Sequence, residues 1–66
     1  MTLHITINTE NKKSFGKTEY EIIEETARIL NMRVIKTMKN IGITKDIVKL
    51  IDSEGCRVGS FGWVKE

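Results

Sequence analysis

Asp46-Ile-Val-Lys-Leu-Ile-Asp-Ser-Glu-Gly-Cys-Arg-Val-Gly-Ser-Phe-Gly-Trp-Val64 is the stretch that decides the fold, because it predicts two strands joined by a short turn. Apolar residues dominate the first run. The turn, Asp52-Ser-Glu-Gly55, ends on a glycine, which tolerates the left-handed backbone of a short hairpin loop. Phe61 and Trp63 occupy alternate positions of the second run. The hairpin therefore predicts a sheet with two faces, one of which can meet a helix.

Upstream of the hairpin, the sequence predicts one more strand and one long helix. Leu3, Ile5 and Ile7 alternate with polar residues, which is the period of a half-buried strand. Thr18 followed by Glu21 forms a capping box at the start of a helix. The apolar residues that follow the helical period, and that we expect to face the sheet, are Tyr20, Ile23, Ala27, Leu30, Val34, Met38 and Ile41.

The predicted helix ends at Gly42, a residue suited to the left-handed position past a helix C-terminus. Such a helix is about 33 Å long, whereas a seven-residue strand spans about 23 Å. The helix should therefore overhang the sheet or break near Asn31. Residues 45–54 have a second interpretation, in which Thr44 caps another helix, because periodicity alone does not separate short apolar runs.

The element order β-α-β-β predicts an α+β fold, a single domain over residues 1–66 with a three-stranded sheet and one long helix on one face. A right-handed crossover makes the first two strands parallel, and the hairpin places the third strand antiparallel between them.

Composition restricts the class of protein. A chain of 66 residues buries little surface, so self-association is expected to add stability. One Cys and one His supply neither an intrachain disulfide nor a four-ligand zinc site, and we expect no metal and no cofactor. No apolar run exceeds two residues and the first residues do not resemble a signal peptide, so we expect a cytoplasmic protein outside the membrane.

A phosphate-binding loop is suggested by Asn11-Lys-Lys-Ser-Phe-Gly16-Lys17-Thr18, which resembles the Walker A motif with Asn11 in place of its first glycine. The loop follows a strand and opens a helix, where free backbone N–H groups attract anions. The candidate anion-binding residues are Lys12, Lys13, Gly16, Lys17 and Thr18. The alternative is that Thr18 caps the helix while the lysines are solvated, and a nucleotide hydrolase would need a larger parallel sheet.

A second candidate site lies on the hairpin. If Asp52 pairs with Cys56, one face of the hairpin carries aromatic and basic side chains, which suit stacked bases and phosphates. The residues of that predicted binding face are Ile47, Lys49, Ile51, Arg57, Phe61 and Trp63. The alternative is a dimer or partner interface, since Trp and Phe are favoured there as well.

The segment Gly59-Ser-Phe-Gly-Trp-Val64 also resembles the RNP1 signature of RNA-recognition motifs, and β-α-β-β is the order of that family's first four elements. The resemblance implies a single-stranded RNA-binding sheet face. It is limited to these features, because Ser60 replaces the family's glycine, Gly59 replaces its basic residue, and a second helix and fourth strand are not predicted.

A third candidate surface is an oligomer interface made by Ile22, Ile29 and Met32, which lie opposite the main apolar stripe of the helix. The alternative is that they are isolated apolar residues on the surface. Catalysis is not expected, because Cys56 and His4, the one nucleophile and base pair available, lack a third residue to orient the histidine.

These observations predict a small non-enzymatic regulatory protein that acts through protein–protein interaction and forms a homodimer. Its size and composition also suit accessory proteins of phages and mobile elements. The alternative is a binding module for single-stranded nucleic acid that uses the aromatic and basic sheet face.

Overall fold

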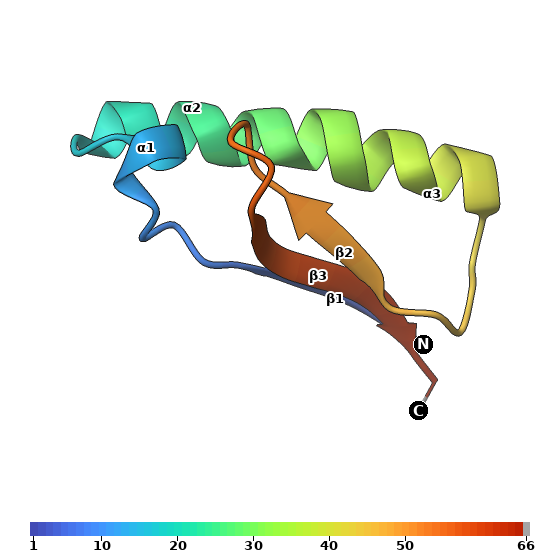
Figure 1. Cartoon of the computed structure of the whole chain (residues 1–66). Helices are drawn as coiled ribbons and strands as arrows, with labels where there is room; N and C mark the ends of the chain where they lie inside the picture. Colours follow the sequence, from blue (N-terminus) through green and yellow to red (C-terminus); the bar gives the residue numbers. More distant parts are fainter. Residues whose placement is uncertain (66) are drawn as a thin grey trace.

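The computed structural model describes residues 1–65, which form a three-stranded sheet covered on one face by helices (Figure 1). The elements in chain order are β1 (Thr2–Ile7), α1 (Lys12–Phe15), α2 (Glu19–Ile29), the π-helical segment η1 (Leu30–Ile35), α3 (Lys36–Ile41), β2 (Val48–Ile51) and β3 (Arg57–Val64). The small α+β fold predicted from the sequence is confirmed.

The sheet has the strand order β1-β3-β2, with both neighbouring pairs antiparallel. β1 and β2 therefore point in the same direction with β3 between them, as predicted. The strand interpretation of residues 45–54 is confirmed for Val48–Ile51. The turn also agrees with prediction, because the Asp52 amide donates to the Cys56 carbonyl and Gly55 has a φ of 81°.

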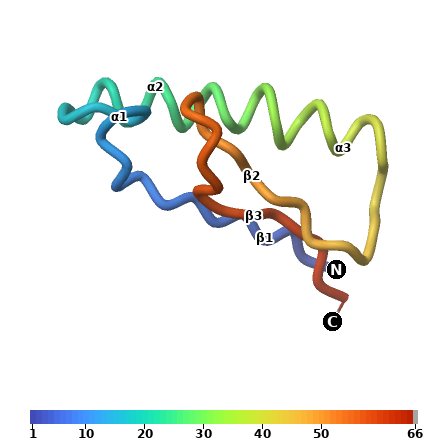
Figure 2. Tube along the Cα trace, in the orientation of Figure 1, coloured from blue at the N-terminus to red at the C-terminus, as the bar shows by residue number. Residues whose placement is uncertain are grey.

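α2, η1 and α3 follow one another without interruption and form one long helix, residues 19–41 (Figures 1 and 2). It begins at the predicted capping box, in which Thr18 Oγ1 accepts from the Glu21 amide while the Glu21 carboxylate accepts from the Thr18 amide. It ends at Gly42, whose φ is 67°. Near Asn31 the helix does not break; instead it widens into the π segment.

The π segment changes which side of the helix is buried. On a regular α-helix, residues five apart point about 140° away from each other. Ile29 and Val34 are nevertheless both buried, because π-type hydrogen bonding brings residues five apart onto the same side. The predicted stripe is therefore wrong in the first half of the helix, where Tyr20 is 71% exposed and Ile23 is 64% exposed. It is also wrong at the last residue of the helix, since Ile41 is 48% exposed.

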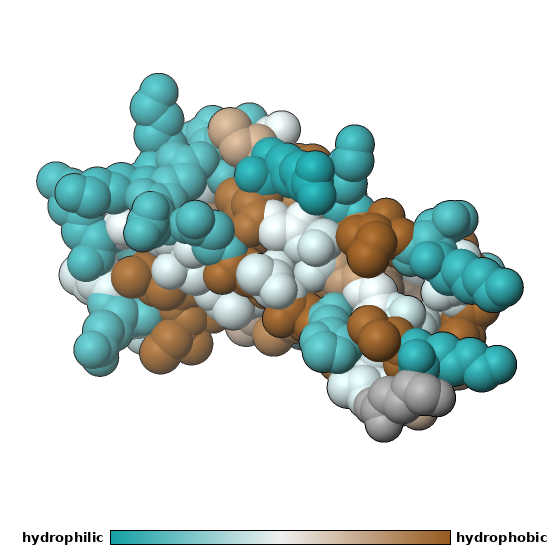
Figure 3. Space-filling model, turned by 90° about the horizontal axis from the view of Figure 1, so that it is seen from below, coloured by the Kyte–Doolittle hydropathy of each residue, from teal (hydrophilic) through white to brown (hydrophobic). Residues whose placement is uncertain are grey.

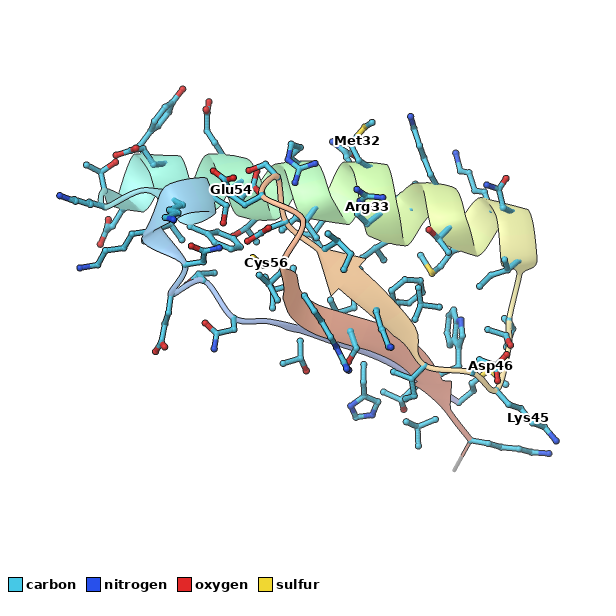
Figure 4. The ribbon with its side chains drawn as sticks, viewed as in Figure 1. Met32, Arg33, Lys45, Asp46, Glu54 and Cys56 are labelled. Atoms are coloured by element: carbon cyan, nitrogen blue, oxygen red, sulfur yellow. The ribbon has the colours of Figure 1, made fainter. Side chains whose placement is uncertain are left out.

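The same change corrects the predicted oligomer interface. Ile29 is fully buried in the core, and Ile22 is half-buried and packs against it. Met32 alone of the three is exposed, and its side chain points away from the sheet (Figure 4). The three residues therefore do not form one exposed surface.

A β-bulge in the hairpin corrects the predicted faces of the sheet. Ile51 lies opposite Arg57 but Leu50 lies opposite Gly59, which leaves Val58 as an extra residue in β3. Because a shift of one residue exchanges the two faces of a strand, Phe61 points toward the helix. It is 2% exposed and packs with Leu50 and Val58, so its predicted position on the outer face is wrong.

α1 is a single helical turn where the sequence predicted a polar loop. Asn11 caps it by accepting a hydrogen bond from the Lys13 amide. The turn buries Phe15 completely among core residues. An isolated aromatic residue in a polar stretch has no periodicity to indicate burial, which is why the sequence did not predict this contact.

Two buried carboxylates join the hairpin turn to the helices. Asp52, which is 2% exposed, accepts from Asn11 Nδ2 at 2.8 Å and from Ser14 Oγ at 2.7 Å, and so holds α1 against the turn. Glu25 on α2 accepts from the Ser53 amide at 2.9 Å and pairs with Arg28 at 2.7 Å. Figure 2 shows α1 and the hairpin turn next to each other, both overlapping α2 in this view.

None of the helices within residues 1–65 is long and apolar enough to cross a membrane.

Candidate functional site

The N-terminus, the end of β3 and the loop between α3 and β2 lie at one end of the molecule (Figure 1). A cavity of about 260 Å³ lies there, and its lining comes from three separate parts of the chain. The lining residues are Met1, Ile43, Thr44, Lys45, Trp63 and Lys65. The fold thus brings together residues that are up to 64 positions apart in the sequence.

Several large apolar side chains are exposed at this end of the molecule. Met1 is 61% exposed and Ile43 is 63% exposed at the cavity, while Ile47 is 66% exposed nearby. The Ile47 side chain lies against Gly62, and because consecutive residues of a strand point to opposite faces, Ile47 is on the face of the sheet opposite to Trp63. Val64, beside Trp63 in the chain, is 46% exposed. We call this set, with Lys45, Trp63 and Lys65, the terminal patch.

The charged residues of the terminal patch are mainly basic. Lys45 and Lys65 line the cavity, and Asp46 is the acidic residue of the adjoining loop. The Lys45 side chain extends away from the sheet (Figure 4). In Figure 3, hydrophobic and hydrophilic residues are interspersed at this end of the molecule. The patch therefore combines apolar contact area with positive charge at its rim.

Trp63 contributes an unusual polar atom. Its Nε1 is buried and has no hydrogen-bond partner among the residues that the structure describes. Most buried indole N–H groups find an acceptor, and an unpaired one costs about 1–3 kcal/mol. Trp63 is also one of the residues that line the cavity. The patch thus includes an indole N–H group that has no acceptor among the described residues.

The predicted binding face of the hairpin is divided by the structure. Ile47 and Lys49 are exposed, whereas Phe61 is in the core. Trp63 lies on the same face as Phe61, since the two are separated by one residue of β3. The remaining two, Ile51 and Arg57, lie opposite each other beside the bulge. The continuous aromatic and basic face that the sequence predicted is not formed by these residues.

The candidate anion-binding residues surround the start of α2, where the protein's own carboxylate already lies. Glu21 accepts from the Thr18 amide and hydroxyl, at 3.3 and 2.9 Å. A side chain at Gly16 would collide with that carboxylate, which explains the glycine at this position. Lys12 and Lys13 belong to α1, and they and Lys17 are exposed. Hydrogen bonding to Thr18 lowers the pKa of Glu21, so a negative charge occupies the helix N-terminus.

The structure does not bring Cys56 and His4 together. His4 lies opposite Gly62, which is six residues along the chain from Cys56, or about 20 Å of extended strand. The most strongly bonded carboxylates, Asp52 and Glu25, accept hydrogen bonds from groups of this chain. They therefore serve the structure of the hairpin turn.

Sequence reasoning found two members of the terminal patch, Ile47 and Trp63, and missed the others. Met1, Ile43, Lys45, Val64 and Lys65 are close to one another only after the chain has folded. One local indication existed: Ile43 and Ile47 stand in a short polar connection after the helix-ending Gly42, where neither belongs to a helical or strand period. Apolar residues in such connections are candidates for contact surfaces.

Comparisons of this chain with protein-family models, with curated proteins and with solved structures found no match.

Proposed function

We propose that this chain is a non-enzymatic regulatory protein that acts by binding another protein, and that the terminal patch is its contact surface. The observation that carries the proposal is the exposure of Met1 and Ile43, 61 and 63%, at a cavity that is also lined by Trp63. Exposed apolar side chains that gather at one place mark candidate interaction sites. Aromatic residues such as Trp63 are also enriched in protein interfaces.

The chemistry of the patch suggests the kind of partner. A cavity of about 260 Å³ with walls from Met1, Ile43 and Trp63 suits one apolar side chain of a partner. Lys45 and Lys65 at the same cavity favour acidic residues beside that side chain. We therefore propose a partner segment that has an apolar anchor flanked by Asp or Glu.

We also propose that the protein is cytoplasmic and that it is of the accessory type that phages and mobile elements encode. The single thiol, Cys56, is exposed and free, which suits a reducing compartment. Single-stranded nucleic acid is the less favoured ligand. Stacking of bases needs exposed rings, and Phe61 is enclosed in the core.

A cross-linking experiment with a matched control tests this proposal. Ile43 and Ile23 are the same residue type with nearly equal exposure, 63 and 64%, but Ile23 lies on α2. A photo-reactive amino acid placed at position 43 should capture a discrete host protein in nuclease-treated lysate, and one at position 23 should not. Ile43→Lys should abolish co-purification of that protein, whereas Ile23→Lys should retain it.

Two results would contradict the proposal. Equal capture at both positions would show that the apolar cluster has no special role. Capture that disappears after nuclease treatment would support the nucleic-acid alternative instead.

A further inference from the structure

β1 is an edge strand that lacks the features that normally protect an edge. Among the described residues it pairs only with β3. It contains no proline, lysine or acidic residue, and its register with β3 is continuous from Thr2 to Ile7. Exposed edges of this kind pair readily with another strand.

The opposite edge of the sheet differs in each of these respects. β2 has only four residues, carries Lys49, and pairs with β3 across the bulge at Val58. Short length, a charged side chain and a bulge each discourage pairing between sheets. The β2 edge thus has features that discourage pairing with another strand, and the β1 edge lacks them.

The backbone of β1 indicates which residues face the open edge. The Asn8 amide donates to the Val58 carbonyl at 2.7 Å, so Asn8 directs its backbone groups toward β3. In an antiparallel ladder these directions alternate along the strand. Thr6 and His4 therefore also bond toward β3, and Leu3, Ile5 and Ile7 direct their N–H and C=O groups outward.

The same three residues carry side chains that the helix covers incompletely. Ile5 lies opposite Phe61, so it is on the face of the sheet that bears the helix. Phe61 is 2% exposed, yet Ile5 is 40% exposed. η1 packs against β2, at the other side of the sheet, and this leaves the β1 side of that face open.

We propose that a second copy of this chain pairs with β1, forming an antiparallel two-fold dimer with a continuous six-stranded sheet. The two-fold axis passes beside Ile5. This register places Ile5 opposite Ile5 of the partner copy and Leu3 opposite the partner's Ile7. All three outward N–H groups and all three outward C=O groups of each copy are then hydrogen-bonded.

A second copy is the occupant because this edge is complementary to itself. A two-fold interface needs one surface that matches its own rotated image. Here every outward residue is aliphatic, so each meets another aliphatic residue across the axis. The strand has no acidic or basic side chain apart from His4, so two copies approach without repulsion between like charges.

The oligomeric state of variants tests the dimer. Light scattering and sedimentation across a wide range of protein concentration should show a dimer for the parent chain. Ile5→Lys places two cations opposite each other at the axis and should give a monomer. Ile47→Lys makes the same substitution in the terminal patch, at an isoleucine that is 66% exposed where Ile5 is 40% exposed, and should remain dimeric.

A second variant separates loss of pairing from loss of folding. Ile5→Pro removes one outward N–H group, and proline is tolerated on an edge strand where that group faces solvent. We expect a folded monomer with a far-ultraviolet circular dichroism spectrum like that of the parent chain. A parent chain that is monomeric throughout would overturn the proposal, as would a dimer that Ile47→Lys dissociates and Ile5→Pro does not.

Cross-linking tests the register. With Cys56→Ser as background, Ile5→Cys places two thiols across the axis at a Cα separation of about 5.5 Å, within the range that a disulfide spans. Leu3→Cys in the same background places them four residues apart, or about 13 Å. Oxidation should link the first variant and not the second. Linking of both, or of neither, would refute this register.

The dimer and the proposed function can fail separately. Ile5→Lys should preserve capture of a host protein through position 43, because β1 pairing leaves the cavity residues unchanged. Ile43→Lys should abolish that capture and preserve the dimer.

Discussion

Thr18 and Glu21 determine where the long helix begins, by bonding reciprocally to backbone amides that otherwise lack partners. Thr18→Ala should lower the free energy of unfolding by about 1 kcal/mol, which is typical for loss of an N-cap. Equilibrium denaturation measures this change. Glu21→Gln is the control, since glutamine also completes a capping box, and it should cost clearly less. Equal losses would show that charge at the helix N-terminus matters more than the cap.

Asp52 and Glu25 should make stability depend on pH. Burial opposes ionisation of Asp52, but hydrogen bonds from Ser14, Asn11 and two amides outweigh it and lower its pKa. The hydrogen bond from Arg28 is the main cause that lowers the pKa of Glu25. A carboxyl whose pKa is lower in the folded state stabilises the protein above its unfolded pKa, here about 4. That stabilisation is lost as the pH falls through the pKa that the carboxyl has in the folded state.

Thermal unfolding followed from pH 7 toward strongly acidic solution should therefore show a midpoint that is nearly constant above about pH 5 and then declines. In Asp52→Asn the decline should be shallower and the midpoint at pH 7 lower. A parallel decline in both proteins would mean that Asp52 does not contribute to it.

At the scale of elements, the π segment accommodates one residue more than the same part of a regular α-helix would. Ile29 and Val34 face the core together only because the turn between them is wide. Deletion of the exposed Met32 should convert η1 to α-helix, in which the old positions 29 and 34 become four residues apart and still share a face. We expect this variant to unfold cooperatively, with the circular dichroism of the parent.

The control is deletion of Glu24, which is exposed and lies in the regular part of the helix. That deletion rotates the first part of the helix by about 100° relative to the rest and should expose Ile22. Loss of cooperative unfolding is expected there. If both deletions behaved alike, the π segment would not be what aligns the two halves.

The contact between β1 and β3 depends on Gly59, because a Cβ atom there would collide with the backbone carbonyl of Thr6. Gly59→Ala should lower the free energy of unfolding by about 1–3 kcal/mol, as overpacking does. Ser60→Ala, at the next position of the same strand, should change it by less than about 1 kcal/mol. Chemical denaturation of both variants provides the comparison. A neutral Gly59→Ala would mean that the two strands can separate slightly without cost.

At the scale of the whole molecule, dimerisation should add to the stability of a small core. A partner that binds only the folded state raises the unfolding midpoint with protein concentration. The midpoint of the parent chain should therefore rise on concentration, and that of Ile5→Lys should stay constant. Calorimetry at several concentrations measures both. A concentration-independent midpoint in the parent would contradict a stabilising dimer.

The sequence by itself determined the order of elements and their ends. Thr18, Gly42 and Gly55 act through local hydrogen bonds and backbone conformation, so neighbouring residues are enough to predict them. The strand order followed as well, because a hairpin after a crossover leaves few possible arrangements. Within the candidate site, Ile47 and Trp63 were identified from their residue types alone.

Tertiary structure decided which side of each element is buried. The bulge at Val58 and the π segment each add one residue, and each rotates everything beyond it relative to a regular period. Their stabilisation comes from distant groups: Phe61 packs with Leu50, and Ile29 with the core that Phe15 completes. The terminal patch likewise exists only where Met1, Ile43 and Trp63 meet, because a surface made from separate segments has no local pattern.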